Sequence, residues 1–311
     1  MVFPAADVIS KQRYTTTQHR ILLTLATLLL ALSMGTTAYC EVIHVGISPE
    51  VFPNTNVHDA LAAIKVWTQS AAKTYGIKAT FEVHIIDSPA ELRDGLEEQR
   101  LEIVSTPINT ILQMNLDTDT IFVPVLRGAF PVRYALVVHR NSTITETEQL
   151  KNKKVAIPRG NAMQLADIWL NAHFQHHVHT TAFNFLTKIT HPEDTSRAGM
   201  QVFFRQVDAA VIPSATLYTM SKLNHQIKKD LFIIEESPPF VPYVLILRPS
   251  WQTPLRYAME QILSELHLTP QGEQMLAMFH CSRLEKNPLT ILEPTLSFLR
   301  KTQKTHSKNS R

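Results

Sequence analysis

The feature that most constrains the fold of this chain is an alternation of short apolar strands with amphipathic helices, which two pairs of consecutive strands interrupt. The first pair is expected at residues 120–128 and 133–140, and the second at residues 231–237 and 243–249. Alternating strands and helices are typical of mostly parallel sheets that helices cover on both faces. The two interruptions therefore predict an α/β protein in which one lobe is inserted into another and two crossing segments join them.

The positions of the interruptions give the expected boundaries of the lobes. Lobe 1 is discontinuous and consists of residues 41–130 and 241–299, whereas lobe 2 is the inserted stretch 131–240. With 311 residues and 44% hydrophobic content, the chain has enough apolar material for two cores of medium size. The basic residues 300–311 are expected to form a disordered tail.

Local patterns add two finer expectations. The apolar and aromatic run at residues 182–189 predicts a strand. The part of the chain beyond the second strand pair is expected to be helical, because Pro254, Pro270 and Pro288 are placed as helix starts.

Residues 1–38 have the pattern of a secretory signal peptide. Three basic residues precede an apolar run at 21–32, and small residues follow it up to Ala38. The run is shorter than the roughly 20 residues that a membrane-spanning helix needs. Cleavage after Ala38 is therefore expected to release the protein into the periplasm. The alternatives are an uncleaved anchor and a lipoprotein modified at Cys40.

Composition and motifs exclude several functional classes. Without residues 1–38 and 300–311, the body carries a net charge of about −4, so the basic character of the whole chain does not indicate nucleic-acid binding. The chain has eight glycines and no glycine-rich phosphate loop, G-x-S-x-G elbow or H-E-x-x-H motif. We expect a binding protein without a cofactor. The alternative is an enzyme on a two-lobed fold, because catalytic groups can assemble in space from distant positions.

Three buried strands of the predicted fold end in polar corners that open helices. Ligands of open α/β sheets bind beyond the carboxyl ends of the strands, where helix N-termini present free N–H groups. Together the corners predict a site for a small anion. Each corner alone is better explained by N-capping, the usual role of Ser, Thr and Asn at helix starts. The corners contain Ser105, Thr106 and Asn109, then Arg159, Gly160 and Asn161, and finally Ser214.

A series of ordered segments carries a resemblance to a known family. Over residues 42–284 the chain resembles the phosphonate-type periplasmic substrate-binding proteins of ABC transporters. The segments, in order, are VGISPE, SPAELRDGLEEQRLEIVSTPINTIL, RGAFPVRYALVVHRNSTITETEQLKNKKVAIPRG, FFRQVDAAVIPS, ESPPFVPYVLILRP and LTPQGEQMLAMF.

The resemblance implies a two-lobed type II periplasmic-binding-protein fold that captures a small anionic ligand in the cleft between the lobes. Phosphonate, phosphate and phosphite are the kinds of oxyanion that it implies. The implied partner is an ABC permease in the inner membrane, with a membrane sensor as the alternative. The protein is expected to be a monomer.

The chain departs from the family pattern at positions that bear on the ligand. Family members commonly have a Ser-Thr-Ser type cluster where this chain has residues 160–163, and amine-binding carboxylates where it has residues such as Ala215 and Tyr243. We therefore expect a ligand without an amine. The histidine of the family corresponds either to His191 or, by ungapped counting, to Thr195.

Side chains near the first crossing are further candidates. Arg127, Arg133 and Tyr134 either line the cleft or face solvent. Of these, Tyr134 is included with Tyr243 among the expected ligand-binding residues.

Two remaining groups bear on metal binding and stability. His173, His176 and His177, with His179 nearby, have a helical spacing that suits a metal, but a polar surface helix has the same pattern and no carboxylate cluster joins them in sequence. In the fold that the resemblance implies, Cys40 and Cys281 belong to the same lobe, so a disulfide between them is a hypothesis.

Overall fold

The computed structural model describes residues 41–309, apart from residues 53–55, 115–117, 119 and 127–129 and the side chains of Asn161 and residues 305–309. The expected signal peptide, residues 1–38, lies outside the described part, as do Cys40 and Arg127. Among the helices that are described, none has the length and the apolar composition needed to cross a bilayer.

The first sheet has six strands from both ends of the chain, in the order β11-β4-β10-β3-β1-β2. β1 and β3 are parallel, and β10 is antiparallel to both β3 and β4. The strands are β1 (Glu41–Ile47), β2 (Ala79–Ile85), β3 (Ile103–Pro107), β4 (Thr120–Leu126), β10 (Tyr243–Leu247) and β11 (Cys281–Pro288).

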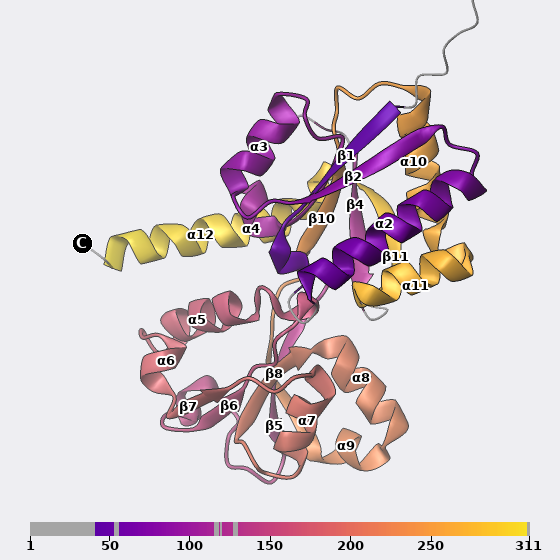
Figure 1. Cartoon of the computed structure of the whole chain (residues 1–311). Helices are drawn as coiled ribbons and strands as arrows, with labels where there is room; N and C mark the ends of the chain where they lie inside the picture. The colour runs from indigo at the N-terminus through magenta and orange to yellow at the C-terminus, as the bar shows by residue number, and fades with distance from the viewer. Residues whose placement is uncertain (1–40, 53–55, 115–117, 119, 127–129, 310–311) are drawn as a thin grey trace, which may run out of the picture. The chain divides into compact units, whose positions relative to one another are not determined.

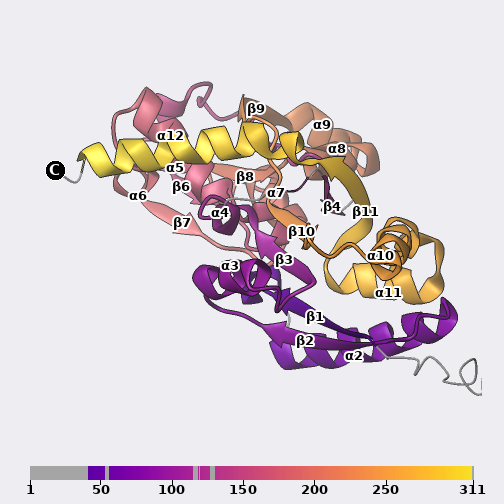
Figure 2. The same cartoon turned by 90° about the horizontal axis from the view of Figure 1, so that it is seen from above.

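Helices cover both faces of this sheet (Figure 1). One face packs against α2 (Val57–Thr74), α10 (Pro254–Glu265) and α11 (Pro270–Met278), and α2 and α11 lie side by side in both views (Figures 1 and 2). The other face packs against α3 (Pro89–Glu97) and the single turn α4 (Ile108–Ile111). Because side chains alternate along a strand, neighbouring residues of β3 face opposite helix layers.

The second sheet is formed by the inserted part of the chain, in the order β7-β6-β8-β5-β9. Aromatic and aliphatic side chains of α5 pack on one face, and α7, α8 and α9 cover the other. The strands are β5 (Tyr134–His139), β6 (Lys154–Ala156), β7 (Lys188–Thr190), β8 (Ala209–Pro213) and β9 (Leu231–Glu236). The helices are α5 (Ala166–His177), α6 (Ala182–Phe185), α7 (Thr195–Phe203), α8 (Ser214–Leu223) and α9 (His225–Asp230).

Both sheets are mixed. The parallel pairs include β1 with β3, and β6 with β7 and β8, whereas β5 and β10 run antiparallel to their neighbours and β11 runs antiparallel to β4. Of these, β5 and β10 follow the crossings, so each enters its sheet against the direction of the α/β repeat. The short 3-10 helices are η1 (Pro49–Val51), η2 (Thr147–Leu150), η3 (Asn161–Met163), η4 (Leu266–Leu268) and η5 (Leu289–Leu292).

Three local expectations were wrong. Within 182–189 only the last residues join a strand, because Thr181 caps the short helix α6 by accepting a hydrogen bond from the Asn184 N–H at 3.2 Å. β11 is a strand within the stretch expected to be helical, since β4 pairs with it along its whole length. The expected disordered tail continues the helix α12 (Glu293–Asn309).

The two crossing segments pair with each other. Val132 and Phe240 exchange main-chain hydrogen bonds of 2.8 and 2.7 Å, forming an antiparallel bridge. The Phe240 ring contacts Tyr134 in lobe 2 and Phe298 in α12, with centroid distances of 5.8 and 4.9 Å. The crossings are therefore braced by packing as well as by hydrogen bonds.

A buried ion pair fixes the start of β3 to the end of β10. Arg248 Nη1 lies 2.9 Å from Glu102 Oε1, and each side chain is only 9% exposed. The other Glu102 oxygen accepts a hydrogen bond from the His44 N–H at 2.8 Å. Arg248 also donates to the Gln99 carbonyl at 2.6 Å.

Replacing Arg248 by methionine should lower the free energy of unfolding by about 3 to 5 kcal/mol, because the Glu102 carboxylate stays buried without its cation. The matched control is Arg100→Met, which removes an ion pair with Glu98 whose side chains are 54% and 63% exposed. Its effect should be no more than about 1 kcal/mol. Denaturant-induced unfolding measures both, and equal losses would contradict the assignment of a structural role to the buried pair.

Candidate functional site

A polar pocket of about 320 Å³ lies where the first crossing meets the starts of α7 and α8. Its walls include the apolar side chains of Leu126 and Val132 and the small side chain of Ala162. The polar side chains that line it are Arg133, Ser196, Ser214, Thr216 and Thr219. The pocket therefore combines one fixed cation with several hydroxyl groups.

The N-terminus of α8 opens on this pocket because the buried strand β8 runs directly into the helix at Ser214. Within the described residues, no side chain caps this helix end. The first-turn N–H groups of Ala215 and Thr216 stand at the positive end of the helix dipole. The neighbouring helix α7 differs, since the Asp194 carboxylate accepts a hydrogen bond from the Arg197 N–H at 2.7 Å. An anion is thus better accommodated at α8 than at α7.

Arg133 is held at the pocket by the crossing. Its carbonyl accepts a hydrogen bond from the Ser214 N–H at 2.9 Å, and its Nη1 donates to the Ser237 carbonyl at 3.2 Å. Ser237 is itself fixed, because its Oγ accepts a hydrogen bond from the Tyr134 N–H at 2.8 Å. A guanidinium has five N–H donors, so Arg133 has further N–H groups that can donate hydrogen bonds to an oxyanion.

A carboxylate that no sequence pattern indicated borders the pocket through its contact with Ser214. Ser214 Oγ donates a hydrogen bond of 2.6 Å to Glu236 Oε1, at the end of β9. The only proton of the Ser214 hydroxyl is therefore engaged, and the oxygen faces a ligand as an acceptor. Thr216 Oγ1 lies 3.2 Å from Thr195 Oγ1, which links the starts of α7 and α8.

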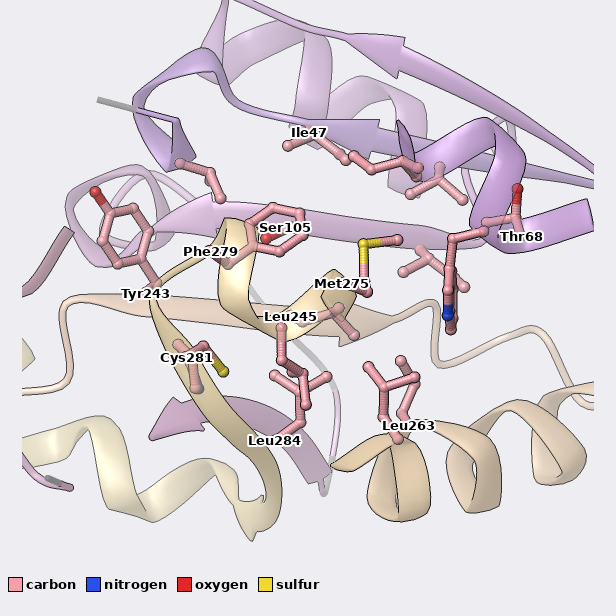
Figure 3. Close-up of a pocket in the computed structure, with 18 of the residues that line it drawn as sticks. Ile47, Thr68, Ser105, Tyr243, Leu245, Leu263, Met275, Phe279, Cys281 and Leu284 are labelled. Carbon is pink, nitrogen blue, oxygen red and sulfur yellow. The ribbon is translucent and has the colours of Figure 1, made fainter. Parts of the chain in front are cut away.

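A second, apolar cavity of about 130 Å³ lies between the six-stranded sheet and the helices α2, α10 and α11 (Figure 3). Leu263, Met275 and Leu284 project into it. Two expected ligand-binding residues, Ser105 and Tyr243, line this cavity rather than the polar pocket. Tyr243 Oη donates to the Glu50 carbonyl at 2.8 Å, and burial raises the pKa of Tyr243 above its ordinary value.

Two further expected residues lie in the interior. Thr106 is fully buried, and its hydroxyl lies 2.9 Å from Ser48 Oγ. Tyr134 is also fully buried, its hydroxyl accepts a hydrogen bond from the Leu165 N–H at 3.3 Å, and burial raises its pKa. Neither side chain lines the polar pocket.

The corner at Arg159 contributes little to the pocket walls. Arg159, Asn109 and His191 are exposed and are absent from the lining of both described cavities. His191 Nδ1 lies 2.9 Å from the Ile157 carbonyl, which places the ring at the end of β6. Gly160 has a φ of 139°, a conformation that favours glycine, and the Asn161 side chain lies outside the described part.

The alternatives for the family's histidine are separated in space. Thr195 is buried at the start of α7 and contacts Thr216, which lines the pocket, whereas His191 contacts the Ile157 carbonyl. Of the two, Thr195 is the residue that contacts the wall of the polar pocket, through Thr216.

The histidines of α5 gain a carboxylate neighbour that the sequence pattern lacked. Donor atoms of His173, His177 and Glu235 lie within 4.8 Å of one another. His173 Nε2 is already bonded to Thr147 Oγ1 at 2.7 Å, and burial, with a smaller contribution from His177, lowers the pKa of His173 to about 4. His173 is therefore neutral at pH 7 and committed to a structural hydrogen bond.

Cys281 is buried and lines the apolar cavity. Its Sγ donates to the Arg283 carbonyl at 3.0 Å, and burial raises the pKa of the thiol to about 11. A disulfide with Cys40 stays a prediction, because Cys40 lies outside the described residues.

Sequence reasoning missed Thr216, Thr219 and Glu236. A signal for the threonines was present, since Thr216 and Thr219 lie one helical turn apart just after Ser214. Glu236 had no such signal, because β9 reaches Ser214 only through the register of the folded sheet.

Solved structures share this architecture at low sequence identity. A binding protein component of an ABC phosphonate transporter from Pseudomonas aeruginosa superposes with a TM-score of 0.50 at 13% identity, over 86% of this chain and 89% of that chain. PhnD1 from Prochlorococcus marinus, solved in complex with methylphosphonate, gives a TM-score of 0.52 at 15% identity, over 85% and 99%. A Xanthomonas citri protein bound to ATP gives 0.53 at 12% identity, over 85% and 98%.

Two helix-covered α/β sheets joined by paired crossings place the fold among the two-lobed type II periplasmic binding proteins. The model of the family described as ABC transporter, phosphonate, periplasmic substrate-binding protein matches residues 51–287. The chain belongs to this family of phosphonate-type substrate-binding proteins, whose role is solute binding for transport. The resemblance seen in the sequence is thereby confirmed. No curated protein matches the chain in sequence.

Proposed function

We propose that this protein captures a small oxyanion of the phosphonate type in the polar pocket at the N-terminus of α8. The observation that carries the proposal is the convergence of an uncapped helix end with the Arg133 guanidinium on one pocket. Helix N-termini and guanidinium groups both favour negative charge, and charge-assisted hydrogen bonds contribute roughly 1.5 to 3 kcal/mol each.

The chemistry of Ser214 favours an oxyanion that carries a proton. Because Glu236 accepts a hydrogen bond from the Ser214 hydroxyl, the Ser214 oxygen offers an acceptor to the ligand. A singly protonated phosphonate can donate its P–OH hydrogen to that oxygen. A sulfonate has no such hydrogen near neutral pH. Its oxygens are acceptors only, so their lone pairs would repel those of the Ser214 oxygen. The pocket should therefore prefer phosphonates to sulfonates of the same size.

The proposed cellular setting is the periplasm. The expected signal peptide at residues 1–38 supports export, and membership of the family supports delivery of the bound solute to an ABC permease. A membrane sensor is the alternative recipient.

Replacing Arg133 by glutamine should weaken methylphosphonate binding by about 10- to 100-fold, because the charge-assisted hydrogen bonds of the guanidinium are lost. Thr216→Val keeps the side-chain shape and the main-chain N–H, so a smaller loss of roughly tenfold or less is expected. Isothermal titration calorimetry on the exported protein measures both dissociation constants.

The matched control for Arg133 is Arg159→Gln, which removes an exposed arginine from the corner that the sequence indicated. It should leave the dissociation constant within about twofold, the scale of a minor surface effect. A large loss in Arg159→Gln together with normal binding in Arg133→Gln would place the anion at the β6 corner and refute the pocket proposed here.

The ligand is proposed to lack an amine. Because Ser214 already engages the Glu236 carboxylate, 2-aminoethylphosphonate should bind no more tightly than methylphosphonate, and methanesulfonate should bind more weakly than either. Competition calorimetry on wild type and Glu236→Gln checks this order. Tighter binding of 2-aminoethylphosphonate that disappears in Glu236→Gln would instead show that Glu236 pairs with an ammonium group.

A further inference from the structure

Three metal-ligating side chains converge on the surface of lobe 1, on the two strands at one edge of its sheet. His44 lies on β1, and Glu82 and His84 lie two residues apart on β2, so the two β2 side chains share one face. One donor atom of each of the three side chains lies within 4.8 Å of the other two. We propose that His44, Glu82 and His84 form a binding site for a divalent first-row transition metal ion, for which Zn²⁺ is the natural test.

The donor distances fit a metal better than they fit hydrogen bonds. His44 Nδ1 lies 3.4 Å from His84 Nε2 and 3.5 Å from Glu82 Oε2. Both distances exceed the usual 2.9 to 3.0 Å of an N–H···O bond. Both contacts also use the same ring nitrogen, His44 Nδ1. Ligands about 2.0 to 2.1 Å from a tetrahedral zinc ion lie about 3.3 to 3.4 Å apart. Two of the three donor pairs are therefore already close to the spacing of zinc ligands, and the third pair lies within 4.8 Å.

Both main-chain polar groups of His44 are bonded to one residue, Glu102, which precedes β3. Its N–H donates to Glu102 Oε2 at 2.8 Å, and its carbonyl accepts from the Glu102 N–H at 2.9 Å. The buried ion pair with Arg248 holds the Glu102 carboxylate in turn. The first ligand is thus positioned before any ion binds, which reduces the ordering that binding requires.

The chemistry of the three ligands selects the class of ion. Two imidazoles and one carboxylate suit zinc and its first-row neighbours, whereas magnesium and calcium prefer oxygen ligands alone. The side chains of His44 and Glu82 are 36% and 57% exposed, so an ion can enter from solvent and water can fill the fourth position. Because the order of strands places β2 at the edge, the ion would fasten that edge strand to β1.

A second histidine group provides the matched control. His173, His177 and Glu235 also bring donor atoms within 4.8 Å in lobe 2, but His173 Nε2 is occupied by its 2.7 Å hydrogen bond to Thr147. His177 is exposed, so His177→Ala removes a histidine from a comparable group without touching the proposed site.

The test uses the exported protein without an affinity tag, stripped of metal with a chelator. Zinc is titrated against a chromophoric chelator for wild type, His84→Ala, Glu82→Gln and His177→Ala, and bound zinc is counted by elemental analysis. Wild type and His177→Ala should retain one tightly bound equivalent. His84→Ala should weaken binding more than roughly 100-fold, beyond the loss typical of outer-shell partners, and Glu82→Gln by at least about tenfold.

Thermal unfolding gives an independent readout. Zinc should raise the unfolding temperature of wild type and His177→Ala in a concentration-dependent way and leave His84→Ala unchanged, because only a folded site gains stability from its ion. Wild-type protein that takes up no zinc would overturn the proposal. Tight binding that survives both His84→Ala and Glu82→Gln, or that His177→Ala abolishes, would overturn it as well.

Discussion

The paired main-chain hydrogen bonds between Val132 and Phe240 are the constraint on which the rest of the site depends. They align the two segments that leave one sheet and enter the other, so β5 and β10 start from a common point. Arg133 follows Val132 directly, and this alignment sets its side chain against the Ser237 carbonyl at the polar pocket. Phe298 of α12 packs on Phe240, and Thr295 Oγ1 accepts a hydrogen bond from the Val241 N–H at 3.0 Å. The C-terminal helix therefore braces the same point.

The electrostatics of the pocket follow from which helix ends are capped. Asp194 satisfies the start of α7 with a carboxylate, which occupies the positive end of that helix. Ser214 stands at the start of α8 but donates its hydroxyl hydrogen bond to Glu236, and no side chain caps the helix, so the first-turn N–H groups of α8 remain available for a ligand. The pocket thus pairs donors on the α8 backbone and Arg133 with one acceptor at Ser214. With the ligand site that we propose, this combination would favour a protonated oxyanion over a fully ionised one.

The two-lobed fold and its crossings could be predicted from the sequence, because apolar strands, proline helix starts and consecutive strand pairs are local patterns. β11 could not, since Cys281 to Pro288 alternate weakly and become a strand only by pairing with β4. Ser214, which lines the polar pocket, could be proposed from the sequence because it directly follows a buried strand. Tyr134 and Thr106 were placed near strand ends, but the face on which each side chain points depends on the pleat and on packing, which put both in the interior. The register of β9 brings Glu236 to Ser214, and no short sequence window contains that contact.

The most direct test of this account is a crystal structure of the exported protein with methylphosphonate at saturation. A phosphonate group is expected at the N-terminus of α8, with its oxygens accepting hydrogen bonds from the N–H groups of Ala215 or Thr216 and from the Arg133 guanidinium. Its P–OH hydrogen should be directed to Ser214 Oγ. A phosphonate bound beside Arg159 and His191, or in the apolar cavity lined by Ser105 and Tyr243, with the α8 pocket holding only solvent, would contradict it.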